Sequence, residues 1–151
     1  MAEDSNPLSP DPAIRATARE RHRWAVDCAA ALGASVIAGP YHSPVGIFTG
    51  EGPREDELAH LAEALRVMAE DASKAGIALS LEAINRFECY ALNTMEAASA
   101  LKAKVAHPNF GYMYDTFHAN IEERDPVGAY RRYAPEINHI HLSENDRGIV
   151  G

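Results

Sequence analysis

The chain repeats one pattern four times: a segment whose apolar residues have helical spacing is followed by a short apolar run. Parallel neighbouring strands need long crossover connections, and a helix supplies such a connection. The alternation therefore predicts an α/β fold with parallel strands. Helices are predicted at residues 13–32, 54–75, 94–105 and 126–133, and strands at residues 34–38, 77–81, 110–114 and 137–142.

Glycine and proline mark the ends of several of these segments. Gly33 and Gly76 follow the first two helical segments, at the position where glycine commonly ends a helix. Gly39 and Pro40 form the turn signal after the first strand. Trp24, on the Arg-rich first helix, is interpreted as a core residue rather than one that stacks on a ligand.

The composition fits one globular domain, residues 1–151, with 46% hydrophobic and 24% charged residues. The net charge of -8 argues against a nucleic-acid partner, which would require clustered basic side chains. No apolar run approaches the roughly 18 residues that a membrane span needs, so no membrane partner is expected. Cys28 and Cys89 are too few for a disulfide framework, and a reducing, cytoplasmic location is expected.

A chemically active residue stands at the end of three successive strands. Glu82, Asp115 and His141 each come at the carboxyl end of an apolar run. In a (β/α)8 barrel the active site is built at this end, from the ends of several strands. The placement therefore favours a barrel over an open sheet and predicts that the three side chains converge.

Each of these residues also has an ordinary structural interpretation. A single acid after a strand is commonly a helix cap or a solvated loop residue, and a single histidine is commonly part of the core. Three such residues on three successive strands are harder to explain in this way. Two carboxylates and an imidazole form a hard ligand set without thiolate, which suits Mn²⁺, Mg²⁺ or Co²⁺ better than structural zinc.

Three sequence blocks resemble the ketose 3-epimerases, the D-tagatose and D-psicose (allulose) 3-epimerase group of the xylose-isomerase-like TIM barrels. The blocks are Leu81–Glu88 (LEAINRFE), Tyr114–Glu123 (YDTFHANIEE) and His139–Gly148 (HIHLSENDRG). Residues 39–46 (GPYHSPVG) also resemble the loop after the fourth strand of that family. Generic barrel packing does not require these motifs, so the resemblance is specific.

The resemblance implies roles for six residues. Glu82, Asp115 and His141 fall where the family places three ligands of a divalent metal, with Mn²⁺ favoured and Co²⁺ or Mg²⁺ also expected. Three further residues fall where the family places groups that hydrogen-bond the ketose around its carbonyl and reacting carbon: Glu88, His118 and Arg147.

The implied reaction is C3 epimerisation of a ketose. A proton is removed at C3, a cis-enediolate is held by the metal, and a proton is returned from the opposite face. Glu82 would be both a ligand and one acid/base. The second acid/base in the family is a glutamate on the eighth strand, which is also the fourth ligand.

By resemblance this chain supplies strands four to seven, so a partial (β/α)8 barrel of about four βα units, truncated at both ends, is expected. A half-barrel leaves two sheet edges and an apolar face open, which predicts a homo-oligomer or a marginally folded chain. The missing glutamate makes activity of these residues alone doubtful. Were they active alone, Glu144 and Asp146 would be the first candidates for the second proton donor.

Two other functions remain as alternatives. A metal-dependent endonuclease of the same superfamily would need more strand-end histidines and a basic groove, which the charge of -8 opposes. A catalytically incomplete fragment acting as a metal-binding or assembly module is favoured by the missing strands. Within the loops, His42 is interpreted either as a substrate contact or as a structural histidine, and Cys89 as a structural thiol.

Overall fold

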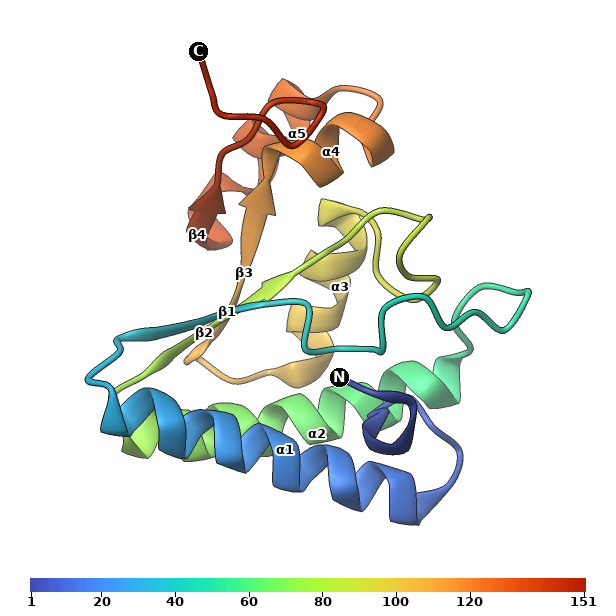
Figure 1. The fold of residues 1–151 in the computed structure, drawn as a ribbon, viewed down its shortest axis with the longest axis vertical. Coiled ribbons are helices and arrows are strands. Elements are labelled where there is room, and N and C mark those ends of the chain that lie inside the picture. The colour runs from blue at the N-terminus through green and yellow to red at the C-terminus, as the bar shows by residue number, and fades with distance from the viewer.

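The computed structural model describes residues 1–151 and contains one sheet of four strands in the order β1-β2-β3-β4. All three strand pairs are parallel. Each connection therefore crosses over the sheet, and helices provide the crossovers (Figure 1). The strands are β1 Val36–Gly39, β2 Ala78–Glu82, β3 Phe110–Asp115 and β4 Ile137–His141.

The α-helices are α1 Pro12–Ala31, α2 Glu55–Lys74, α3 Met95–Val105, α4 Thr116–Glu122 and α5 Pro126–Tyr133, with short 3-10 helices at Glu3–Ser5 and Ala134–Glu136. Two long helices, α1 and α2, pack side by side beneath the sheet (Figure 1). The side chain of Asp11 caps α1 and that of Thr94 caps α3 by accepting backbone N–H groups. Gly33 and Gly76, which follow α1 and α2, have φ values of 68° and 71°, where glycine carries no steric penalty.

The core lies between the sheet and the helices. Alternate residues of the two central strands point into it, including Leu79 and Leu81 of β2 and Phe110 and Tyr112 of β3. From the helices, Leu61 of α2 and other apolar residues complete the cluster. We call this side of the sheet the outer face, and the side that carries the intervening residues the inner face.

The predicted α/β alternation is confirmed, with strand ends within about two residues of the predictions. One helix was not predicted: α4 begins directly after β3, and Asp115 accepts hydrogen bonds from the backbone N–H groups of Phe117 and His118, at 2.8 and 3.2 Å. Asp115 therefore ends a strand and caps a helix at the same time.

The prediction that Trp24 lies in the core is wrong. Its side chain is 63% exposed, whereas His22 on the same helix is only 3% exposed. The face of α1 that packs inward carries two alanines, a valine and a histidine: Ala18, Ala29, Val26 and His22. Because Trp24 lies two positions from His22 and Val26, helical geometry turns it away from that face.

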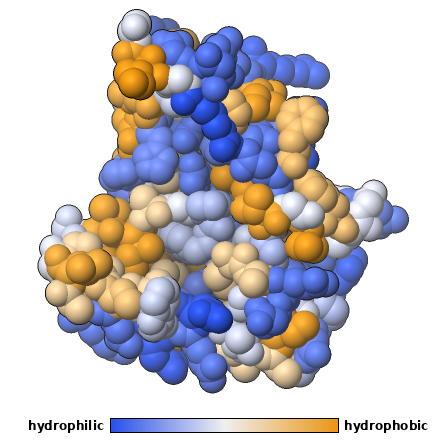
Figure 2. All heavy atoms as spheres, viewed as in Figure 1, coloured by the Kyte–Doolittle hydropathy of each residue, from blue (hydrophilic) through white to orange (hydrophobic).

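The edges of the sheet and part of the surface are open. Neither β1 nor β4 has a strand on its other side. Figure 2 shows hydrophobic residues reaching the surface in patches, one of them over the C-terminal segment. None of the helices combines the length and the apolar character needed to cross a bilayer.

Candidate functional site

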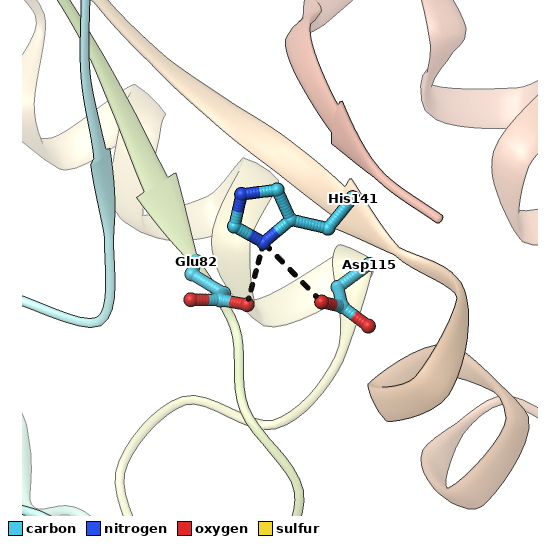
Figure 3. A group of neighbouring side chains, drawn as sticks. All are labelled: Glu82, Asp115 and His141. Carbon is cyan, nitrogen blue, oxygen red and sulfur yellow. Dashed lines mark ion pairs between the residues drawn. The ribbon is translucent and has the colours of Figure 1, made fainter. Parts of the chain in front are cut away.

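Three side chains meet at the carboxyl end of the sheet. Glu82, Asp115 and His141 are the last residues of β2, β3 and β4, and Asp115 pairs in register with His141. Figure 3 shows the imidazole of His141 directed at both carboxylates. Parallel neighbouring strands end on the same side of the sheet, so residues far apart in sequence converge there.

The distances fit a single bound cation. His141 Nδ1 lies 3.5 Å from Glu82 Oε1 and 3.4 Å from Asp115 Oδ2. One ligand atom from each residue lies within 4.8 Å of the other two. Ligand atoms that share an ion at bond lengths of about 2.0–2.6 Å lie within about 5 Å of one another. Two carboxylates and an imidazole are also donors that Mn²⁺, Co²⁺ and Mg²⁺ accept.

Burial and the neighbouring carboxylate both disfavour the charged form of Glu82. Burial raises the pKa of Glu82 well above its usual range, and the nearby charge of Asp115 raises it further, while His141 acts in the opposite direction. A cation between the carboxylates would reverse this effect by favouring their charged forms. The arrangement is therefore electrostatically suited to a divalent ion.

A second group of side chains lies beside these three. The backbone N–H of Asn85 donates to His118 Nδ1 at 3.0 Å, and Asn85 Nδ2 donates to Glu88 Oε1 at 2.9 Å. A backbone N–H can only donate, so Nδ1 of His118 is the acceptor and the neutral ring carries its hydrogen on Nε2. That Nε2 lies 3.7 Å from Glu82 Oε1, and burial lowers the pKa of His118.

Arg147 closes the group from the loop after β4. Its guanidinium forms an ion pair with Glu88 and lies 4.3 Å above the ring of Phe117. Its backbone has a φ of 64°, a left-handed conformation that is uncommon for a residue other than glycine. All six residues singled out in the sequence line one cavity of about 370 Å³: Glu82, Glu88, Asp115, His118, His141 and Arg147.

Comparison with known proteins identifies the fold family. The family described as "Xylose isomerase-like TIM barrel" matches residues 2–149, almost the whole chain. The chain belongs to the xylose isomerase-like TIM barrel family. The partial (β/α)8 fold expected from the sequence is thereby confirmed.

Within the xylose isomerase-like family, the chain is similar to ketose 3-epimerases. A ketose 3-epimerase of Arthrobacter globiformis is 34% identical over 151 residues, which cover 100% of this chain and 52% of the relative. A solved structure of L-ribulose 3-epimerase has a TM-score of 0.95 at 34% identity, covering 100% of this chain and 50% of that one.

The structure of a D-allulose 3-epimerase from Methylomonas sp. in complex with D-allulose has a TM-score of 0.94 at 31% identity, covering 99% of this chain and 52% of that one. The resemblance to ketose 3-epimerases is confirmed by these relatives. The chain spans about half the length of the relatives that it matches.

Two further residues of this candidate site were not predicted from the sequence. Asn85, 2% exposed, bonds both Glu88 and His118, and Phe117 lies against Arg147. Both stand inside the motifs that carry the resemblance, in Asn-Arg-Phe-Glu and Asp-Thr-Phe-His. The side chain of an asparagine in a loop after a strand commonly forms hydrogen bonds with the nearby backbone. This tendency is the sequence signal that could have identified Asn85 as a structural residue of the loop.

Other residues considered in the sequence lie outside the cavity. His42 is fully buried with its Nδ1 3.9 Å from Cys89 Sγ, which supports the structural interpretation of both residues. Burial lowers the pKa of His42 to about 4, so its ring is neutral. Glu144 and Asp146 do not line the cavity, so the structure does not bring either one to the position of a second proton donor.

Proposed function

We propose that this chain carries part of the active site of a metal-dependent ketose 3-epimerase. The observation that carries the proposal is the 370 Å³ cavity in which three potential metal ligands face three hydrogen-bonding side chains. The names of the similar proteins support the reaction type, because they are ketose, L-ribulose and D-allulose 3-epimerases.

Glu82, Asp115 and His141 would hold the metal, with Mn²⁺ favoured and Co²⁺ or Mg²⁺ as alternatives. A divalent ion at this position would acidify the C3 proton of the ketose and stabilise the negative charge that develops on its oxygens. The geometry fits this assignment because the three ligand atoms already lie within 4.8 Å of one another.

Glu82 would accept the C3 proton on a carboxylate oxygen. A proton acceptor must be unprotonated at the start of the reaction, and the bound cation would favour that charged form of the carboxylate. His118 would donate its Nε2 hydrogen to a substrate oxygen, and Arg147 would donate from its guanidinium. Glu88, held by Asn85 and Arg147, would accept a hydrogen bond from a hydroxyl group of the sugar.

Inversion at C3 needs a second acid/base on the opposite side of the planar enediolate. The six cavity residues come from β2, β3, β4, helix α4 and the loops after β2 and β4, so we infer that the group facing Glu82 across the substrate is not among them. We assign this second group, and the fourth metal ligand, to the part of the relatives' length that this chain does not span.

We also propose that residues 1–151 form one partial-barrel domain in a homo-oligomer. Beside the open edge strand β4 lies an apolar groove of about 430 Å³, lined by Val127, Tyr130, Ile140 and Leu142 among others. A second copy would cover this groove and an open edge. Sedimentation should show a dimer or larger species, and a compact monomer that unfolds cooperatively would contradict the proposal.

A second candidate function is a metal-binding or assembly module without activity of its own. The two open sheet edges and the half-length match to the relatives favour it. The compartment also remains a proposal: the two free cysteines, Cys28 and Cys89, fit a reducing cytoplasm.

An epimerisation assay separates the two candidates. D-psicose and L-ribulose would be offered to the 151-residue chain and to the protein from the full reading frame around it. Activity that disappears with exhaustive chelation and returns with Mn²⁺ is expected for the full frame. Activity that persists without metal would contradict the epimerase mechanism, and Mn²⁺ binding without any epimerisation would favour the module.

A further inference from the structure

The pairing of β3 with β4 contains an irregularity just before the proposed metal site. Tyr112 pairs with Ile137, but the next residue of β3, Met113, pairs with His139. Asn138 is therefore an extra residue in β4, a bulge. Bulges are rare in parallel sheets, and near active sites they commonly redirect a side chain.

The bulge decides which face of the sheet His141 occupies. Residues paired in register in a parallel sheet point to the same face, and successive residues alternate between faces. Glu82 pairs with Met113, and Asp115 lies two residues beyond Met113, so both carboxylates occupy the inner face. With regular pairing, Asp115 would oppose Ile140, and His141 would turn away from the carboxylates. The extra residue brings His141 opposite Asp115 instead.

The side chain of Asn138 ties this bulge to β2, two strands away. Asn138 Oδ1 accepts a hydrogen bond from Ser80 Oγ at 2.6 Å, and Asn138 Nδ2 donates to the Leu79 backbone oxygen at 2.9 Å. Ser80 is fully buried and lies two residues before Glu82, on the same face. The amide of Asn138 thus links the strand that ends in His141 to the strand that ends in Glu82.

The intervening strand leaves room for this link only because Gly111 has no side chain. A Cβ atom added at Gly111 would lie 2.4 Å from Asn138 Nδ2 and 2.6 Å from its Cγ, well inside van der Waals contact. Gly111 pairs with Ser80, so it lies directly beneath the path of the amide. Its φ is not in the left-handed region, so this close approach, and not backbone conformation, is what calls for glycine here.

We propose that Asn138 is a positioning residue for the metal site: by holding the bulge over Gly111, it keeps His141 on the face of Glu82 and Asp115. The inference rests on the proposed function, because it takes the three side chains to be metal ligands. The β3–β4 register that Asn138 would hold does not depend on a bound metal. Asn138 is not among the residues that line the cavity, so it acts through His141.

The first arm of the test measures Mn²⁺ affinity of the 151-residue chain by electron paramagnetic resonance of free Mn²⁺. Asn138→Ala should weaken binding by about 10-fold or more, as loss of a group that orients a ligand commonly does. Gly111→Ala should produce a similar loss by displacing the amide, and the double variant should lose little more than either single one.

The matched control is Asn109→Ala. The amide of Asn109 also makes two hydrogen bonds, both donated by its Nδ2, to the backbone oxygens of Ile77 at 2.7 Å and Ala69 at 3.3 Å. Asn109 precedes β3, at the other end of the sheet from the proposed metal site. This variant should lower thermal stability and leave Mn²⁺ affinity unchanged. Equal Mn²⁺ affinity in wild type and Asn138→Ala would overturn the inference.

The second arm reads the register without metal, from cross-strand nuclear Overhauser contacts between β3 and β4. Loss of the Met113–His139 and Asp115–His141 pairing in Asn138→Ala is the expected result, and an unchanged register would overturn the inference. If the wild type bound no Mn²⁺, the proposed metal site would be wrong. The β3–β4 pairing in Asn138→Ala would still show whether Asn138 holds the register.

Discussion

The two faces of the sheet have different tasks. On the outer face, Leu79, Leu81, Phe110 and Tyr112 are at most 1% exposed and pack against the helices. The inner face carries polar groups at the carboxyl end of the strands, and its cavity is lined by carboxylates, imidazoles and a guanidinium. Because side chains alternate along a strand, neighbours such as Leu81 and Glu82 serve opposite faces. Stability and chemistry should therefore respond to different substitutions.

The largest expected effect is on the inner face. Glu82→Gln removes the proposed proton acceptor and one anionic ligand while keeping the shape of the side chain. In the protein from the full reading frame, turnover of a ketose should fall by about 10³-fold, which is within the range of general acid–base catalysis. Its affinity for Mn²⁺ should fall as well. Thermal stability should change little, since the variant keeps the outer face intact.

Glu63→Gln is the matched control for this variant, since Glu63 is an exposed residue of α2. Turnover and Mn²⁺ affinity should both stay at the wild-type level. Full epimerase activity in Glu82→Gln would show that Glu82 is not the proton acceptor. It would also contradict the assignment of the chemistry to the inner face.

The next largest effect is on the outer face. Phe110→Ala deletes a ring that is 1% exposed and should lower the free energy of unfolding by about 3–5 kcal/mol, from lost burial and the cavity left behind. Urea unfolding followed by circular dichroism measures this change. A loss below about 1 kcal/mol would mean that the outer face does not hold the fold as described.

A smaller effect is expected for the side chains that would hold the substrate. Arg147→Ala removes a guanidinium that pairs with Glu88 and stacks on Phe117, but it touches none of the three proposed ligands. Turnover of a ketose should fall by about 10–100-fold, while Mn²⁺ affinity stays near the wild-type value. If turnover and Mn²⁺ affinity fell by similar factors, Arg147 would contribute to metal binding and the assignment to substrate binding would be wrong.

The smallest expected effect is on the pH dependence of unfolding, through His22 of helix α1. Burial lowers the pKa of His22, whose Nε2 donates to the Tyr41 backbone oxygen at 3.1 Å and whose Nδ1 is buried without a partner. The unfolded chain therefore takes up this proton at higher pH than the folded one, so stability is lost as pH falls below about 6.5. His22→Gln should make unfolding less dependent on pH between about 7 and 5. An unchanged pH dependence would exclude a contribution from His22.

Much of the fold was predictable because burial leaves a periodic trace. The apolar runs ended at Leu81 and Tyr114 in the prediction, and β2 and β3 end one residue later, at Glu82 and Asp115. The convergence of strand-end residues follows from parallel pairing, so the positions of Glu82, Asp115 and His141 could be inferred. Helix α4 could not, because seven residues are too few for a clear helical period.

The supporting residues were harder to infer because hydrophobic patterns do not report where a side-chain amide bonds. Ile137–His141 has the spacing of a regular strand, and nothing in it marks Asn138 as the extra residue. Trp24 was misplaced for the opposite reason: residue type suggested burial, but the packing face of α1 carries His22. Tertiary contacts decided both cases.

The central claim is that Glu82, Asp115 and His141 bind one divalent ion. The most direct measurement is anomalous diffraction at the manganese edge from crystals of this chain soaked in MnCl₂. The account predicts one strong peak at the carboxyl end of the sheet, within about 2.0–2.6 Å of an oxygen of each carboxylate and of a ring nitrogen of His141. A fully occupied peak elsewhere, with these three side chains free of metal, would contradict it.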